Sequence, residues 1–588
     1  MQMTRRQFIG LVGAVAAVTG LPEVAIASAL QDEENHALAA RELTTLAQTL
    51  GPGPAGNLGY RPVASGPGEA HIVRGDLAAP QDGREARRES LVNFVHLTDQ
   101  HIVDVESPAR VEFLDRYNDG QCGGMPFASA YRPHEPASAR ITDSMLDRLK
   151  KIKYSPVTGT PIQAMISTGD NTDNQQLNEL SLFIGLMDGS HVTPKSGHAT
   201  EYQGVQSSGD LHYWHPDPAV ADIYKTKFGF PAAPGFIEDA LQPFNAVGAR
   251  LPWYTCFGNH DGLVQGNAPA NPGFNRIGTG GTKVVGAPSK ANPCADFAAP
   301  VATGPSRTAT PDADRRFLNR REWIQTHLDS PGLPAGHGLA PSNLAPPTVY
   351  YTADVGSVRW IVLDTVNPGG YADGSIGDAQ LKWLEARLTD AQAAQKLVML
   401  FSHHAPRSLN NPAQNPDPLY PDSMDLPRHE TDDVLAVVNA FSCVIAWVNG
   451  HSHRNTITKQ ASWWDIGTAA HIDWPPQSRM IDVVDNKDGT ISIFGTMVDH
   501  GDDPVVSKAR ELMGNDPHAG FDGGTGAPED RNVELLVAHP FPSGADTSGA
   551  NSLAVPTVGI PKNLALGGAL AVVGARKLFD FRNRGLSE

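Results

Sequence analysis

Polar side chains of the kinds that bind metal ions gather in five short motifs along the chain. In chain order the motifs are Asp99-Gln100-His101, Gly169-Asp170-Asn171, Gly258-Asn259-His260-Asp261, His403-His404 and Gly450-His451-Ser452-His453. Zinc, manganese and iron(II) accept mixed imidazole and carboxylate ligands, whereas magnesium and calcium prefer oxygen. None of the four cysteines lies in a motif, so a thiolate site is not expected. The motifs predict two divalent metal ions, which would be Mn, Fe or Zn.

A metal pair of this kind has a defined chemistry. It needs a shared ligand, and a carboxylate can bridge two ions through its two oxygens. Such a pair polarises a phosphoryl oxygen and converts bound water into hydroxide near neutral pH. The sequence therefore points to hydrolysis of a small phosphorylated substrate.

Each motif follows a short apolar segment that is rich in β-branched or aromatic residues. The segments are 94–97, 164–166, 253–257, 397–401 and 443–448. Such runs are typical of strands buried on both faces. Ligand sites in open α/β sheets gather beyond the carboxyl ends of the strands. We therefore expect the five motifs to converge in space although they lie far apart in sequence.

In this order the motifs resemble those of the calcineurin-like metallophosphoesterases, whose pattern is D-x-H, G-D, G-N-H-[D/E], a His after a strand, and G-H-x-H. The resemblance covers roughly residues 94–497 and implies two sets of ligands that share Asp170 as the bridge. The first metal ion would be held by Asp99, His101, Asp170 and His453, and the second by Asp170, Asn259, His403 and His451. The resemblance also implies that His260 protonates or stabilises the leaving-group oxygen, that Asp261 orients His260, and that a metal-bridging hydroxide attacks phosphorus in line.

Three positions near the motifs qualify this assignment. In purple acid phosphatases a tyrosine stands three residues after the bridging aspartate and binds iron(III), but this chain has Asp173 there. An iron(III)–tyrosinate centre is therefore not expected. His404 stands beside the ligand His403, and a supporting or substrate-binding role for it stays open. His471 follows the last motif and is a candidate neighbour of the site.

Periodic apolar residues between the motifs predict the elements that position them. Helices are expected over 138–152, 378–388 and 431–441, and hairpins are expected from 348–353 with 358–364 and from 480–484 with 491–498. The resemblance implies an α/β (α+β) fold. It consists of two mixed β-sheets packed face to face as a sandwich, with helices outside in four layers and with long loop insertions.

The composition suggests four segments along the chain. We expect a signal peptide over 1–29, an N-terminal extension over 30–90, the metallophosphoesterase domain over 91–500, and a Gly/Pro-rich C-terminal segment over 501–588 with a short apolar helix at 564–575. That helix is short for a membrane span, although weak membrane association stays open.

The domain carries loop-like insertions at 189–250, 262–346 and 405–428, where substrate choice is expected to lie. Aromatic and histidine residues cluster in the first insertion. They would form either a substrate wall or ordinary loop packing, and they comprise Tyr202, His212, Tyr213, Trp214 and His215.

The N-terminus resembles a twin-arginine signal. Arg5 and Arg6 precede an apolar run over 8–21 and small-residue cleavage sites near residues 27–29. We expect the twin-arginine export machinery to carry the folded chain to a secreted, periplasmic or cell-surface location, although an N-terminal membrane anchor is an alternative. Export after folding suits an enzyme that acquires its metal as it folds. In an oxidising compartment Cys122 and Cys294 could pair, whereas Cys256 and Cys443 are expected to be buried in strands.

The overall charge argues against nucleic acid as a partner. The formal net charge is −18, so a polyanion would be repelled, and the chain has no Gly-rich nucleotide-binding loop. Two hypotheses remain. One is an exported dinuclear phosphoesterase that hydrolyses either phosphodiesters or phosphomonoesters. The other is a metal-containing cell-surface binding protein without turnover, which the intact His260 and Asp261 disfavour. The sequence leaves the oligomeric state open.

Overall fold

The computed structural model describes residues 23–115, 130–286, 304–416, 418, 425–518 and 520–541. The twin-arginine motif, the cysteines Cys122 and Cys294, and the apolar helix expected at 564–575 lie outside these residues. Among the described helices, none is both long and apolar enough to span a bilayer.

The first of the two large sheets has seven strands and carries three of the motifs. Strands β4, β5 and β8 are parallel to one another, and β19, β20 and β21 follow as an antiparallel group. In spatial order the strands are β3 (Ile72–Arg74), β21 (Val533–Ala538), β20 (Thr490–Asp499), β19 (Gln477–Asp485), β4 (Glu89–Leu97), β5 (Ala164–Ser167) and β8 (Trp253–Thr255).

The second large sheet has six strands and carries the other two motifs. Its four central strands are parallel, and an antiparallel strand closes each edge. In spatial order the strands are β11 (Tyr351–Val355), β12 (Val358–Val362), β14 (Leu397–Phe401), β16 (Val444–Asn449), β18 (Trp464–Gly467) and β17 (Thr456–Lys459). Both expected hairpins, β11–β12 and β19–β20, are confirmed.

The two sheets pack face to face through side chains on their inner faces. Phe94 of β4 meets Trp360 of β12 at a ring-centroid distance of 4.8 Å and Phe401 of β14 at 5.7 Å. In β12 and β14 the residues adjacent to Trp360 and Phe401 point to the opposite face of the sheet. Ile361 and Leu400 therefore pack in a separate outer cluster. Successive side chains of a strand therefore build both the shared core and the contact with outer helices, and the predicted sandwich of two mixed sheets is confirmed.

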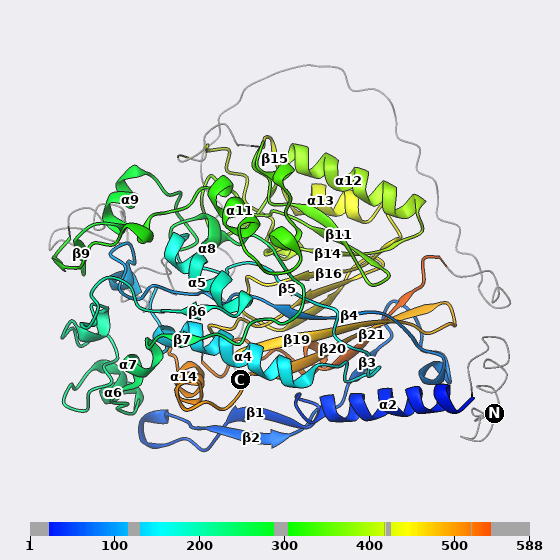
Figure 1. The fold of residues 1–588 in the computed structure, drawn as a ribbon, viewed down its shortest axis with the longest axis horizontal. Helices are drawn as coiled ribbons and strands as arrows, with labels where there is room; N and C mark the ends of the chain where they lie inside the picture. Colours follow the sequence, from blue (N-terminus) through cyan, green and yellow to red (C-terminus); the bar gives the residue numbers. More distant parts are fainter. Residues whose placement is uncertain are drawn as a thin grey trace, which may run out of the picture. The chain divides into compact units, whose positions relative to one another are not determined.

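Helices cover the outer faces of the sandwich. Helices α12 (Asp378–Ala393) and α13 (Thr431–Val438) lie on the six-stranded sheet, and α4 (Ser138–Ile152) lies beside α14 (Pro504–Gly514) over the other (Figure 1). The bounds of α4 are those predicted. Helix α12 runs five residues beyond the expected end because Ala391 continues its buried face, and α13 ends three residues early in a turn at Asn439.

The sheet continues past the boundary that we expected at residue 500. Strand β21 pairs with β20 along its length, and β3, from the expected N-terminal extension, pairs with β21. The Gly, Pro and Asp residues on either side hid this short apolar strand, whose first five residues are buried. Strands β21 (533–538) and β3 (72–74), on either side of the expected domain boundaries, are thus part of the core sheet.

The insertions contain more structure than the expected loops. Helix α11 (Arg320–Leu328) begins at an Asn319 capping box and buries Trp323 and Ile324. In the first insertion Tyr213 and Trp214 are buried in a hydrophobic cluster with Tyr131 and Phe236. These two aromatic residues are therefore packing residues and not an open substrate wall.

The remaining elements are short or peripheral. Cys256 and Cys443 are buried and unpaired, as predicted. The other helices are α2 (Glu23–Arg41), α5 (Leu177–Asp188), α6 (Ile223–Phe228), α7 (Phe236–Ala240), α8 (Asn259–Gly262) and α9 (Pro272–Gly278). The other strands are β1 (Gln48–Pro52), β2 (Val63–Pro67), β6 (His191–Val192), β7 (Phe244–Asn245), β9 (Thr282–Val284), β10 (Ser306–Thr308), β13 (Ile376–Gly377) and β15 (Arg428–His429).

Candidate metal centre

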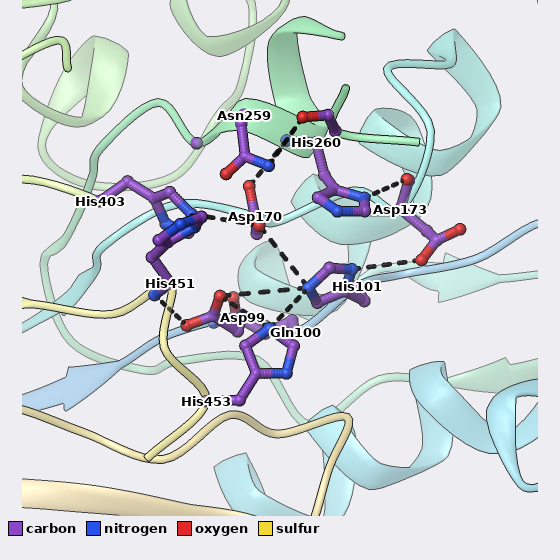
Figure 2. A network of polar contacts seen from close by, with 12 residues as sticks. Asp99, Gln100, His101, Asp170, Asp173, Asn259, His260, His403, His451 and His453 are labelled. Carbon is purple, nitrogen blue, oxygen red and sulfur yellow. Dashed lines mark hydrogen bonds and ion pairs between the residues drawn. The ribbon is translucent and has the colours of Figure 1, made fainter. Parts of the chain in front are cut away.

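The predicted ligand residues converge on one point. Each lies just beyond the carboxyl end of β4, β5, β8, β14 or β16, and Figure 2 shows their side chains around a common centre. Five of the seven adopt left-handed backbone angles, with φ between 43° and 65°: Asp99, His101, Asp170, His451 and His453. Such angles cost on the order of 1 kcal/mol or more per residue and cluster at functional sites. The sharp turns aim these side chains back over the sheet edge.

Two motif glycines allow the loops to approach one another. A Cβ on Gly258 would lie 2.2 Å from the backbone nitrogen of Asp170, and a Cβ on Gly450 would lie 1.9 Å from Thr98 Oγ1. Neither distance is tolerable for a real side chain. The glycines are thus required by the close contact between loops that follow different strands.

The first cluster of ligand atoms surrounds Asp99 Oδ1. His453 Nε2 lies 3.2 Å from this oxygen and 3.3 Å from His101 Nε2. His101 Nε2 is in turn 3.6 Å from Asp170 Oδ2. These are the four residues expected to hold the first metal ion.

The second cluster begins at the same Asp170 oxygen. His403 Nε2 lies 3.1 Å from Asp170 Oδ2, and His451 Nδ1 lies 3.2 Å from His403 Nε2. Asn259 donates its side-chain amide to the carbonyl oxygen of Gly266 at 3.0 Å, which turns its Oδ1 away from that bond. Asp170 therefore belongs to both clusters, as a bridging carboxylate must.

The donor atoms fit a pair of metal ions. Metal–ligand bonds of about 2.0–2.2 Å place neighbouring ligands roughly 3–3.5 Å apart. The distances between neighbouring donor atoms given above are 3.1–3.6 Å, which is close to this spacing. Asp99 Oδ1 and Asn259 Oδ1 are buried and accept no hydrogen bond. A buried oxygen without a partner is costly unless a ligand satisfies it. The mixed oxygen and nitrogen set without thiolate fits Mn, Fe or Zn.

The electrostatics of the centre also favour cations. Burial opposes charge on His453, but the neighbouring carboxylates Asp99 and Asp473 outweigh it and raise the pKa of His453 to about 10. In the same way Asp170 outweighs burial at His403 and raises the pKa of that side chain to about 9. The carboxylates thus create a field that attracts positive charge to this edge of the sheets.

Two carboxylates that sequence reasoning did not assign as supports hold the ligands of the first cluster. His101 Nδ1 donates to Asp173 Oδ1 at 3.2 Å, and His453 Nδ1 donates to Asp473 Oδ2. Each carboxylate contacts a buried arginine, Arg110 for Asp173 and Arg132 for Asp473. A carboxylate behind a ligating histidine fixes its tautomer and raises its basicity. Asp173 is therefore a support for His101.

His404 is not placed as a ligand. Its Nδ1 lies 2.8 Å from Thr365 Oγ1 and its Nε2 lies 2.8 Å from the carbonyl oxygen of Ala372, so both ring nitrogens are engaged. Its ring centroid lies 4.4 Å from that of His451. His404 lies close enough to His403 and His451 to share a metal ion with them, but the engagement of both ring nitrogens favours a supporting role.

The structure corrects the expected role of Asp261. The His260 ring packs on His101 with a centroid distance of 4.4 Å, and its Nδ1 donates to the backbone oxygen of Asp173 at 2.6 Å. Asp261 instead accepts from the backbone nitrogens of Gly258 and Thr172 at 2.9 Å and 3.1 Å. Asp261 therefore joins two ligand loops, and the Asp173 carbonyl orients His260.

His471 is a neighbour of the centre, as the sequence suggested. Its backbone nitrogen donates to the carbonyl oxygens of Thr98 and Asp99 at 3.2 Å each, and its Nε2 meets Ser478 Oγ at 3.0 Å. It steadies the loop of Asp99 from behind. Asp473, two residues further on, is the more important residue of this segment, and nothing in its local sequence distinguished it.

Comparison with known proteins gives a local match. No protein-family profile matches the chain. A glycerophosphodiester phosphodiesterase from Enterobacter lignolyticus is 29% identical over 114 residues, which is 19% of this chain and 37% of that protein. The chain thus spans little more than a third of the length of this curated relative. This local match agrees with the resemblance of the ordered motifs to those of the calcineurin-like metallophosphoesterases.

Comparison with solved structures gives weak likenesses. A dimetal phosphatase from Danio rerio aligns with 70% of this chain and all of its own, at 13% identity and a TM-score of 0.33. A protein assigned as a 5′-nucleotidase from Staphylococcus aureus aligns with 72% of this chain and 58% of its own, at 12% identity and a TM-score of 0.27. At such scores these likenesses do not bear on the assignment.

Proposed function

We propose that this protein is an exported, dinuclear metal-dependent phosphoesterase. The observation that carries the proposal is the pair of clusters that share Asp170 Oδ2, each with a buried oxygen that accepts no hydrogen bond. Bound there, two divalent ions would polarise a phosphoryl oxygen and lower the pKa of water to near neutral. The seven candidate ligands would hold these two ions.

His260 supplies the proton for the leaving group in this proposal. Its Nδ1 must carry a hydrogen, because the Asp173 carbonyl oxygen that faces it can only accept. Nε2 is then the nitrogen that can hold and release a second proton. The close approach of Gly266, where a Cβ would lie 2.4 Å from His260 Nε2, keeps the ring in place. A proton delivered from Nε2 to the departing oxygen would leave a neutral ring that is still bonded to Asp173.

A phosphodiester is the substrate class that we favour. The support is the local match to a glycerophosphodiester phosphodiesterase, since the metal ligands themselves would serve diesters and monoesters alike. The test compares hydrolysis of bis-p-nitrophenyl phosphate with that of p-nitrophenyl phosphate, each with chelator and with added Mn²⁺. Faster, metal-dependent cleavage of the diester is expected. Preferential cleavage of the monoester would overturn the substrate assignment and leave the phosphoesterase assignment standing.

The alternative is a metal-containing cell-surface binding protein without turnover. The same assay separates the two when it is paired with elemental analysis and with a matched Asp170→Asn variant. Two metal ions per chain without cleavage of either substrate would favour the binding protein. Cleavage that is lost in Asp170→Asn together with the metal supports the enzyme.

Export is proposed from the sequence motif alone. Replacement of Arg5 and Arg6 by lysine removes the twin-arginine pair while it keeps the charge. The precursor of the double variant should accumulate in the cytoplasm, as seen by fractionation and immunoblotting. Undiminished export of the variant would show that the twin-arginine pathway is not used.

A further inference from the structure

A chain of buried hydrogen bonds runs beneath the metal centre and ends on Asp99. Thr98 Oγ1 donates to Asp99 Oδ2 at 2.6 Å, and Thr168 Oγ1 donates to Thr98 Oγ1 at 2.8 Å. Thr168 Oγ1 also lies 2.8 Å from Nε2 of His96, a residue of β4. All four side chains are at most 1% exposed. Water therefore has no access to these four side chains and could not replace their hydrogen bonds.

The direction of each bond follows from the number of hydrogens available. A carboxylate can only accept, so the single hydrogen of Thr98 points to Asp99. The hydrogen of Thr168 then points to Thr98, and the Thr168 oxygen must accept from His96. His96 is therefore protonated on Nε2.

The other ring nitrogen of His96 completes the chain. His96 Nδ1 lies 2.8 Å from Thr468 Oγ1, and Arg479 Nε lies 3.1 Å from that same hydroxyl. A guanidinium can only donate, so Thr468 accepts from Arg479 and donates its own hydrogen to the bare Nδ1. Burial and the neighbouring Arg479 lower the pKa of His96 to about 3, which agrees with a neutral ring. Five hydrogen bonds thus point in one direction, from a buried cation to a metal-ligating carboxylate.

The chain decides which Asp99 oxygen is left for the metal. Asp99 Oδ2 accepts from Thr98 Oγ1 and, at 3.1 Å, from the backbone nitrogen of His451. Asp99 Oδ1 accepts from none and faces His453. The carboxylate is thus held by two donors on one oxygen and is free on the other.

We propose that His96, Thr168 and Thr98 are positioning residues of the first metal position, and that they align Asp99 by relaying hydrogen-bond donation from Arg479. None of these three side chains contacts a ligand atom that faces the metal position, and none would contact a substrate. Their side chains reach the centre through Asp99 Oδ2. The backbone oxygen of Thr168 also accepts from His403 Nδ1 at 2.9 Å, and side-chain substitutions leave that bond in place. The inference rests on the two-metal centre of the proposed function, but its readout is metal affinity and it does not require turnover.

Two pairs of nearly isosteric variants test the relay. Thr98→Val and Thr168→Val keep the shape of the side chain and remove the hydroxyl, while Thr98→Ser and Thr168→Ser keep the hydroxyl and remove a methyl group. Loss of such outer support typically costs 10–100-fold in metal affinity. Titration of the chelator-treated protein with Mn²⁺ should show that loss of affinity at the first position in the valine variants, with the serine variants near wild type.

The expected pattern distinguishes a relay from simple packing. A packing role predicts equal effects of serine and valine, or a larger effect of serine because it leaves a small cavity. Valine and serine variants that bind the first ion equally well would overturn the proposal. If Thr98→Val fails to fold, the Thr168 pair, one hydrogen bond further from the ligand, gives the same comparison.

The tautomer of His96 tests the assigned direction of the hydrogen bonds, and it can be measured in protein without metal. Nitrogen-15 spectra of histidine-labelled protein in chelator should show one ring with hydrogen on Nε2 that does not titrate between pH 5 and pH 8. The signal is assigned by its loss in His96→Gln. Hydrogen on Nδ1, or titration of this ring in that range, would reverse the assigned direction and overturn the relay. Absence of turnover in the wild-type enzyme, by contrast, would count only against the proposed function.

Discussion

The two halves of the metal centre share Asp170 but are supported in different ways. In the first position His101 and His453 each donate to a carboxylate, Asp173 and Asp473 respectively. In the second position His403 donates only to a backbone carbonyl, that of Thr168, at 2.9 Å. A carboxylate strengthens a histidine ligand more than a neutral carbonyl does because it adds a full charge behind the ring.

The supports of the first position are also linked to one another. Glu135 Oε2 accepts from Arg110 Nη2 at 2.9 Å and from the backbone nitrogen of Arg132 at 3.0 Å, and these arginines contact Asp173 and Asp473. All of these side chains are buried. The first position is thus preorganised by a network of buried charges. We infer that it binds its ion more tightly than the second, whose ion exchanges more readily.

Loss of the shared carboxylate should have the largest effect. Asp170→Asn removes the charge that both positions use, while the amide keeps the size of the side chain. Wild-type protein should contain about two ions per chain, and the variant should lose most of both. Elemental analysis after gel filtration measures this. One tightly held ion that is unaffected by the substitution would contradict the bridge and the comparison built on it.

His260→Ala should reduce activity by the next largest factor without loss of metal. A general acid contributes about 10²–10⁴-fold, so kcat should fall by that order while the metal content stays near wild type. The loss should be greatest for esters with poor leaving groups, because p-nitrophenolate needs little help from a proton. A drop in metal content, or equal slowing of the hydrolysis of esters with good and poor leaving groups, would contradict the role of general acid. His260 would then bind or position a metal ion at one of the two positions.

Asp473→Asn should weaken the first position selectively. The amide can keep a hydrogen bond to His453 Nδ1 but lacks the charge, so affinity for the tighter ion should fall roughly 10–100-fold. A stepwise Mn²⁺ titration should show a smaller difference between the two dissociation constants than in the wild type. The matched variant for the second position is Asn259→Ala, which should weaken the other step. If both variants weaken the same step, the assignment of ligands to two positions is wrong.

The convergence of the candidate ligands could be predicted from the sequence because each stands in a short motif after a buried strand. The apolar runs fix where each strand ends, and parallel strands bring their ends together. Helical periodicity predicted the bounds of α4, whereas the sandwich was implied by the family resemblance. Prediction from the sequence failed for β21, where six strand residues are surrounded by Gly, Pro and Asp and the local composition outweighed the apolar pattern.

The supports could not be predicted because they depend on loops whose paths the sequence does not reveal. Asp473 and Arg132 are separated by 341 residues and pair only after the loops have folded. The role expected for Asp261 failed for a related reason. Adjacency in sequence suggested a bond to His260, but α8 turns the Asp261 carboxylate toward the loop of Asn171 and Thr172.

His404 offers the finest test of the difference between the two positions, because it supports the second one through packing rather than charge. Its ring lies against His451 and bonds to Thr365 Oγ1 and the Ala372 carbonyl. His404→Phe keeps a ring and removes both bonds, each worth about 1 kcal/mol, so the weaker ion should bind a few-fold less tightly. His404→Gln can restore a bond to one of the two partners and serves as the control. The tighter step of the Mn²⁺ titration should not move in either variant. A shift in the tighter step would mean that His404 reaches the first position and that the two halves are less separate than their supports indicate.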